Sequence, residues 1–245
     1  MRQLLPSILG LAAAWYLADL AIDSSAFPGP IETISKLASI VLASDFYLSV
    51  FATLGLSVIG ASLGLVAAYV VGVLMAKSSF LYRSIRPSLN AIRSVPTIIL
   101  LPLFLVVAGP SPIAVVALTT HVIFGKLIVF VVDGLRNTNP NFDELGELLG
   151  LSRVAKFFLI ELPQSFKLTI TGIQLSASRA YGTVILGGLF IGTPGLGRSL
   201  AWARETADYG AMFSYGLLLA LLGVLIYELL LNLENRVLTV WGIIR

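Results

Sequence analysis

The stretch that decides the fold is Val50–Ala76, VFATLGLSVIGASLGLVAAYVVGVLMA, in which no residue carries a charge. A helix needs about 20 mostly apolar residues to cross the hydrocarbon core of a bilayer. The rest of the chain has the same character, because 57% of its 245 residues are hydrophobic and only 12% are charged. In soluble domains, about 45–50% of the residues are apolar and about 25% are charged. The composition therefore predicts an all-α integral membrane protein.

A break divides the next apolar run into two helices. The uncharged run Val95–Gly125 contains Gly109-Pro110-Ser111-Pro112, and such residues cannot continue a helix. The first of the two helices is short, so we expect the amphipathic stretch Leu81–Ser94 to supply its cytoplasmic half. Six spans are predicted in a single transmembrane domain over residues 1–245, namely 4–22, 50–76, 95–108, 113–132, 168–191 and 211–233.

The distribution of lysine and arginine predicts the orientation of these spans. With both termini in the cytoplasm, 11 basic residues of the loops and ends lie inside and three, Lys36, Arg198 and Arg204, lie outside. Cytoplasmic loops of membrane proteins carry the excess of positive charge. The segment Asp23–Ser49 is then external, and its apolar spacing predicts a helix on the outer surface. Leu4–Ile22 is longer than a signal-peptide core, so we expect it to be retained.

Composition also excludes several kinds of site. The chain has no cysteine and one histidine, His121, so neither a thiolate site nor a multi-histidine metal site can be built. No nucleophile–base pattern predicts a catalytic residue, and the net charge of +3 is too small and scattered for nucleic acid. Gly192–Ser199 nearly matches a phosphate-binding loop, but Arg198 replaces the lysine and no strand precedes it.

The longest cytoplasmic loop, residues 133–167, contains the signals of two short helices. Asn141 is placed to cap the first helix, with Glu144 three residues later completing a capping-box pattern. Gly150 is placed to end that helix in a left-handed turn.

The second loop helix begins and ends on equally local signals. Ser152 can cap it, and it must stop near Leu162 because Pro163 follows. The loop is therefore predicted to be a helix–glycine–helix hairpin held between the fourth and fifth spans.

This loop resembles the one that permeases of ABC importers carry between two spans. Their pattern is a glutamate, two small residues, three variable residues and a glycine, then nine residues, an isoleucine, one residue and Leu-Pro. The matching positions here are Glu144, Gly150, Ile160, Leu162 and Pro163. The chain departs from the pattern at Leu145 and Gly146, where the family favours two alanines.

Three further segments extend the resemblance over about residues 28 to 242. Pro96–Phe104 is similar to the family's proline-punctuated third span, and Gly195-Leu196-Gly197 to its outer turn after the fifth span. Leu233–Arg236, followed by Trp241, is similar to its cytoplasmic end. Within the superfamily the pattern looks most like permeases for nitrate, alkylsulfonates and taurine.

The resemblance implies partners and a role for the loop hairpin. It would be the coupling helix that docks in a groove of a cytoplasmic ABC ATPase dimer, which binds ATP and Mg. Glu144 would pair with a basic residue of the ATPase, and Gly150 would permit the turn. The apolar anchors would be Phe142, Leu145, Leu148 and Leu149.

The resemblance also implies the setting of the chain. A second permease subunit, expected to be an identical copy, and an extracytoplasmic solute-binding protein would complete a multi-pass importer in the cell inner membrane. The chain itself would be no enzyme and would hold no cofactor. Its solute is not named by the sequence.

Ionisable residues at membrane depth predict a solute path. His121 and Lys126 share the fourth span, while Arg179 lies about twelve residues from either end of the fifth. Charges at that depth usually face a cavity or one another, and an unpaired Arg179 would favour an anion. Alternatively, Lys126 reaches towards the cytoplasm and Arg179 only shapes the bundle. Related permeases often have a glutamate where this chain has Gly188.

A different class of protein stays open as the alternative. A secondary transporter or channel would work without an ATPase, but it would need coupling-ion sites and usually an internal repeat. Neither feature is visible in the sequence.

Overall fold

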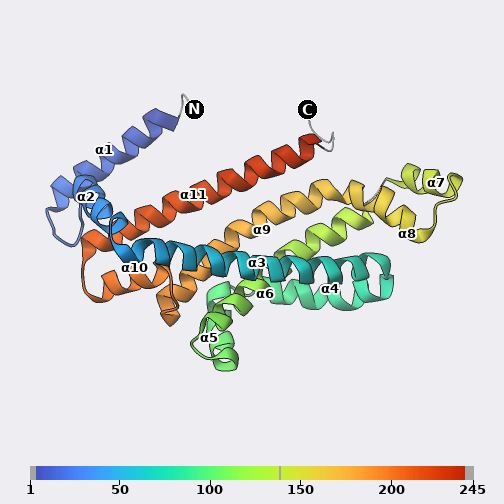
Figure 1. Ribbon diagram of the computed structural model, residues 1–245, viewed down its shortest axis with the longest axis horizontal. Helices are drawn as coiled ribbons and strands as arrows, with labels where there is room; N and C mark the ends of the chain where they lie inside the picture. The colour runs from blue at the N-terminus through green and yellow to red at the C-terminus, as the bar shows by residue number, and fades with distance from the viewer. Residues whose placement is uncertain (1–3, 138, 241–245) are drawn as a thin grey trace. The chain divides into compact units, whose positions relative to one another are not determined.

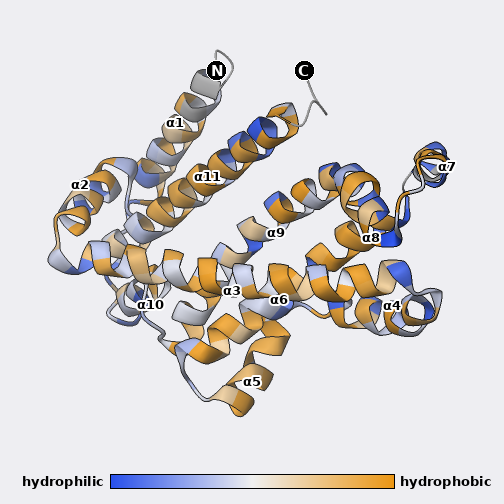
Figure 2. Ribbon diagram, turned by 45° about the vertical axis from the view of Figure 1, so that its right-hand side comes forward, coloured by the Kyte–Doolittle hydropathy of each residue, from blue (hydrophilic) through white to orange (hydrophobic). Residues whose placement is uncertain are grey.

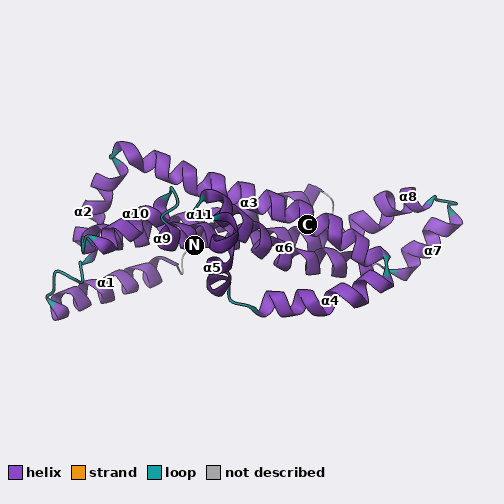
Figure 3. Ribbon diagram, turned by 90° about the horizontal axis from the view of Figure 1, so that it is seen from below, coloured by secondary structure: helices purple, strands orange, loops and turns teal. Residues whose placement is uncertain are grey.

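The computed structural model describes residues 4–137 and 139–240, and every regular element in them is helical (Figures 1 and 3). In chain order, the helices up to the loop are α1 (Leu4–Ile22), α2 (Pro30–Val41), α3 (Ser44–Lys77), α4 (Ser79–Ser94), α5 (Thr97–Ala108) and α6 (Pro112–Arg136). They continue with α7 (Pro140–Leu148), α8 (Arg153–Lys156), the π-helix η1 (Phe157–Glu161), α9 (Leu162–Ile191), α10 (Leu196–Glu205) and α11 (Tyr209–Val240).

The chain divides into two compact units. Unit 1 comprises Met1–Thr53 and Ile185–Gly223, and unit 2 comprises Leu54–Val184 and Val224–Arg245. Helices α3, α9 and α11 contribute residues to both units. A single domain over the whole chain stays a prediction.

In unit 2, α3 packs closely along α6 through glycines. A Cβ atom on Gly60 would lie 2.6 Å from the side chain of Thr119, and one on Gly64 would lie 2.7 Å from Ile123. The hydroxyl of Thr120 donates a hydrogen bond to the carbonyl of Gly60 at 3.3 Å. Small residues let membrane helices approach this closely. Gly60 and Gly64 therefore serve packing between two helices of the same chain.

The predicted break between the third and fourth spans is confirmed. Helix α5 ends at Ala108, Gly109 has a φ of +70°, and α6 begins at Pro112. The residues of α5 itself are mostly hydrophobic (Figure 2). Within the described residues, four helices are long and apolar enough to cross a membrane, or five if the bent pair α4 and α5 is one span. Six spans stay a prediction.

The expectation that Leu81–Ser94 supplies the cytoplasmic half of the third span stays a prediction, because α4 and α5 are a bent pair that counts as one span only if both belong to it. This stretch forms α4, and the directions of α4 and α5 differ by 102° across the short break between the two helices. Pro96 follows Val95, whose extended ψ of 125° is the conformation that a residue before proline prefers. The apolar side of α4, including the buried Leu89, packs on a core shared with α3 and α6.

The expectation that the second loop helix stops near Leu162 is wrong. Helix α8 passes through η1 into α9 without a break. Proline normally clashes with the carbonyl four residues earlier. Here the backbone N–H of Leu162 bonds to the carbonyl of Phe157, five residues back, so a wider π turn directly precedes Pro163.

In unit 1, α9 and α10 meet where their backbones nearly touch. A Cβ atom on Gly188 would lie 2.7 Å from both the Gly197 Cα and the Arg198 backbone nitrogen. Thr53 of α3 accepts a hydrogen bond from the Leu196 N–H at 2.9 Å and is almost fully buried. These contacts hold the start of α10 in place, and they leave no room for a glutamate at position 188.

Candidate functional site

The loop hairpin begins at a cap that differs from the predicted one. Asn139, not Asn141, is the N-cap residue of α7, and its side chain accepts the N–H of Asn141 at 3.0 Å. Proline is well suited to the first position of a helix, so Pro140 starts α7 one residue before Asn141. Glu144 consequently takes no part in a capping box and is exposed.

The turn of the hairpin has the predicted geometry. Gly150 has a φ of +63°, the Leu151 N–H bonds to the Gly146 carbonyl at 3.0 Å and the Gly150 N–H to the Glu147 carbonyl at 3.0 Å. These two bonds form a Schellman motif. Ser152 then caps α8, as predicted, by accepting the N–H of Ala155 at 3.2 Å.

Two contacts fold the hairpin back onto the start of α9. A Cβ atom on Gly146 would lie 3.0 Å from the side chain of Ile160, which is buried. The Asn139 N–H donates to the Gln164 side-chain oxygen at 2.9 Å. The family positions Gly146 and Ile160 therefore hold α7 against η1, while Leu162 and Pro163 are half-buried beside them.

The apolar residues predicted as anchors are left uncovered in this chain. Leu148 is 86% exposed, and the other three are also exposed. Together they form what we call the anchor patch, which consists of Phe142, Leu145, Leu148 and Leu149. Large apolar groups gathered on one exposed surface mark a site for a partner.

An ion pair joins the hairpin region to α3. Lys77, the last residue of α3, bonds to the carboxylate of Glu161 in η1, and its ammonium lies 5.2 Å from the centroid of the Phe157 ring. The Glu161 side chain is only 13% exposed. A displacement of η1 is thereby linked to the end of a long span.

A second candidate region lies where α4, α5 and α6 meet. Arg93, His121 and Lys126 line one small pocket, and the His121 ring lies 5.8 Å from that of Phe104. Gly125 makes room for Arg93, since a Cβ atom there would lie 3.2 Å from the Arg93 Cγ. The sequence analysis counted Arg93 among the cytoplasmic loop charges. It missed the proximity of Arg93 to Lys126, because that proximity depends on the bend between α4 and α5.

In the described part of the chain, these cations are not paired with an acidic residue. Lys126 lies within electrostatic range of both Arg93 and Arg179. In residues 4–137 and 139–240, no carboxylate forms an ion pair with any of the three, and the Nε of Arg93 is buried without a hydrogen bond. The guanidinium of Arg179 is exposed. We call Arg93, Lys126 and Arg179 the cation cluster.

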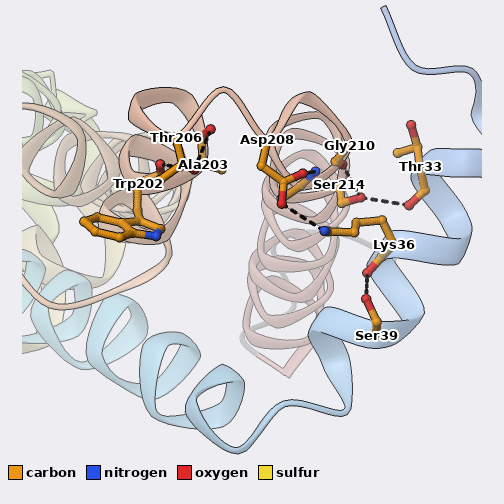
Figure 4. Close-up of polar contacts among 10 residues, drawn as sticks. Thr33, Lys36, Ser39, Trp202, Ala203, Thr206, Asp208, Gly210 and Ser214 are labelled. Carbon is orange, nitrogen blue, oxygen red and sulfur yellow. Dashed lines mark hydrogen bonds and ion pairs between the residues drawn. The ribbon is translucent and has the colours of Figure 1, made fainter. Parts of the chain in front are cut away.

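A cavity of about 730 Å³ lies in unit 1 between α2, the start of α3 and α10. Its wall includes an ion pair between Lys36 and Asp208 at 2.8 Å, and Ser214 donates to the Thr33 carbonyl nearby (Figure 4). The hydrogen bond from Lys36, followed by that from the Ala211 N–H, lowers the pKa of Asp208. These contacts tie α2 to the start of α11.

Residues 62–239 match the family described as "Binding-protein-dependent transport system inner membrane component". The chain belongs to this family. It is therefore an ABC transporter permease, a multi-pass component of the inner membrane whose role is transport rather than catalysis.

Curated relatives of this permease transport several solutes according to their names. The formylaminopyrimidine transport permease protein ThiX of Halalkalibacterium halodurans is 28% identical over 85% of this chain and 83% of its own. The taurine transport system permease protein TauC of Escherichia coli is 26% identical over 98% and 90%. The nitrate import permease protein NrtB of Synechocystis is 21% identical over 88% and 82%.

Solved structures show the same fold. A chain of the inward-facing MetNI methionine ABC transporter matches with a TM-score of 0.67 at 22% identity, covering 78% of this permease and 95% of that chain. A chain of an amino acid ABC transporter with histidines matches with a TM-score of 0.68 at 16% identity, over 83% and 97%.

Proposed function

We propose that this permease belongs to an ATP-driven importer that moves a small anionic solute from an external binding protein into the cytoplasm. The anchor patch is the observation that carries the proposal. It presents four uncovered apolar side chains on a hairpin whose turn, caps and packing are all fixed by the chain itself. A rigid, amphipathic helix of this kind suits docking in a groove of another protein.

The ATPase is the partner that this hairpin fits. ATP and Mg would be bound there, and closure of two ATPase subunits would move the two hairpins of a permease pair. The Lys77–Glu161 ion pair supports transmission of that movement into α3, because it links η1 to the end of the span.

The anionic character of the solute is inferred from the cation cluster. Lys126 and Arg179 lie at predicted membrane depth, Arg93 lies beside Lys126, and none of the three pairs with a carboxylate in the described residues, so their charge needs compensation where it is costly. An anion passing along the path would supply it. The relatives named for nitrate and taurine support a solute with an acidic group.

Reconstitution tests the proposal. The permease is placed in proteoliposomes with its ATPase and binding protein, and uptake of labelled nitrate, taurine and a short alkylsulfonate is measured with and without ATP. We expect uptake of one of these anions only with ATP. Uptake driven by an ion gradient without the ATPase would instead establish the secondary transporter, and ATP-dependent uptake of cations alone would refute the anionic class.

A further inference from the structure

We propose that the surface around Tyr82 binds the headgroup of an anionic phospholipid. Helix α4 carries Arg83, Arg86, Asn90 and Arg93 at intervals of three and four residues, which places them on one side of the helix. No acidic residue occurs anywhere in α4. The proposal concerns Arg83 and Arg86 of this helix, together with Arg136 at the end of α6, and does not depend on the transported solute.

Tyr82 brings two of these charges together. The Cζ of Arg136 lies 4.1 Å from the centroid of its ring and that of Arg86 lies 4.9 Å from it. Arg86 also donates a hydrogen bond to the Tyr82 hydroxyl. The ring is partly buried against the core of α3, α4 and α6, so it holds both guanidiniums at a defined place. We call Arg86, Arg136 and Tyr82 the tyrosine platform.

Among residues 4–137 and 139–240, the arginines of the platform have no carboxylate partner. Neither of its arginines forms an ion pair with a carboxylate in the described residues, and Arg83 forms none either. Asp133 lines the adjacent pocket with Arg86 and Arg93 but pairs with neither. Asp133 supplies one negative charge against the three positive charges of Arg86, Arg93 and Arg136, so the pocket and the platform together are net positive. Stacking on an aromatic ring offsets only part of the repulsion between two guanidiniums.

The chemistry of the platform favours a phosphate, and its surroundings favour a lipid. A guanidinium matches phosphate oxygens with two parallel hydrogen bonds. Helix α4 is amphipathic, and its Phe80 and Ile92 are 76% and 44% exposed. A basic amphipathic helix with uncovered apolar residues is typical of the membrane interface, where basic pockets between helices bind anionic headgroups. Acyl chains could then cover the apolar residues while the phosphate neutralises the arginines.

Native mass spectrometry of the purified full-length permease tests this. The protein in detergent is titrated with phosphatidylglycerol, phosphatidylcholine or glycerol 1-phosphate, and bound lipid is counted. We expect phosphatidylglycerol to bind more tightly than phosphatidylcholine, and Arg86→Gln/Arg136→Gln to weaken it at least about tenfold. The control Lys167→Gln/Arg236→Gln removes two exposed basic charges elsewhere and should change the affinity less than about twofold.

Four outcomes would overturn the proposal. They are equal binding of the two lipids, an unchanged affinity in the platform variant, an equal loss in the control, and displacement of the lipid by equimolar glycerol 1-phosphate. An unchanged lipid affinity combined with loss of the ATPase would assign the arginines to a protein interface instead. If the double variant does not fold, each single substitution should still lower the affinity about threefold, and no change in either would count against the site.

Discussion

The guanidinium of Arg179 makes no hydrogen bond or ion pair with a protein group in the described part of the chain, although it projects from the middle of a span. We predict that Arg179→Gln lowers uptake of the anionic solute by roughly 10- to 100-fold. The substitution would remove the charged hydrogen bond that the guanidinium is proposed to donate to the solute. Assembly with the ATPase should be retained. Reconstituted uptake and copurification measure the two effects.

The control for this substitution is Arg204→Gln. Arg204 is exposed on α10, and among the described residues its one ion pair is with its neighbour Glu205 at 3.8 Å. Normal uptake by Arg179→Gln would make Arg179 a structural residue of the bundle and would remove the main support for an anionic solute.

Gly188 illustrates how one missing side chain determines the fit of two helices. We predict that Gly188→Ala lowers the free energy of unfolding by about 1–3 kcal/mol, because its Cβ would overlap the backbone of α10. Gly182→Ala in the same helix is the matched control. Its Cβ would meet no atom within 4 Å, so the gain in helix propensity should leave stability unchanged or raised.

Thermal unfolding of the purified variants in detergent decides between them. Equal midpoints for Gly188→Ala and Gly182→Ala would show that α9 and α10 do not pack as closely as the structure places them.

At the scale of elements, the hairpin turn offers a test in which space and backbone strain are separated. A Cβ atom on Gly150 would meet nothing within 4 Å, so any side chain fits, but its φ of +63° disfavours most residues. Asparagine tolerates this conformation and valine does not. We predict that Gly150→Val abolishes solute-stimulated ATP hydrolysis, whereas Gly150→Asn retains most of it.

Both variants should insert into the membrane at the level of the parent chain. Equal activity of the two would show that the left-handed turn is dispensable for coupling, and loss in both would indicate that glycine is needed for a reason other than its backbone.

Helix boundaries were predictable where a local signal acts alone. The Gly109–Pro112 break, the Gly150 turn and the Ser152 cap all lie where the sequence places them. The cap at Asn141 was wrong because Pro140, a favourable first residue, moves the start of α7 forward. The end at Leu162 was wrong because a π turn accommodates the following proline, and single-residue preferences do not reveal this.

The candidate sites show the same difference between features that depend on local sequence and features that depend on tertiary packing. The exposure of the anchor patch was predictable because its residues lie on or directly after one short helix, and their role as anchors stays a prediction. The cation cluster was found only in part. Arg93 reaches Lys126 through the 102° bend between α4 and α5, which depends on tertiary packing. The tyrosine platform likewise joins residues about fifty positions apart, Tyr82 and Arg136.

At the scale of the whole molecule, each chain supplies one hairpin, whereas the proposed ATPase works as a pair. We therefore predict two permease chains in each assembly. Three glycines of α3 do not form the interface between them, because Gly60, Gly64 and Gly72 are occupied by α6 of the same chain. Native mass spectrometry of the solubilised complex should show a permease content of two 26.2 kDa chains.

Two differently tagged copies distinguish an identical pair from a mixed one. When both are expressed in one cell, purification through one tag should recover the other, because symmetric pairs of identical subunits are the commonest assemblies. Recovery of a single tag together with a different permease would show that the partner is a related chain. A complex with one permease chain in total would contradict the paired mechanism itself, since a lone hairpin could engage only one of the two ATPase subunits.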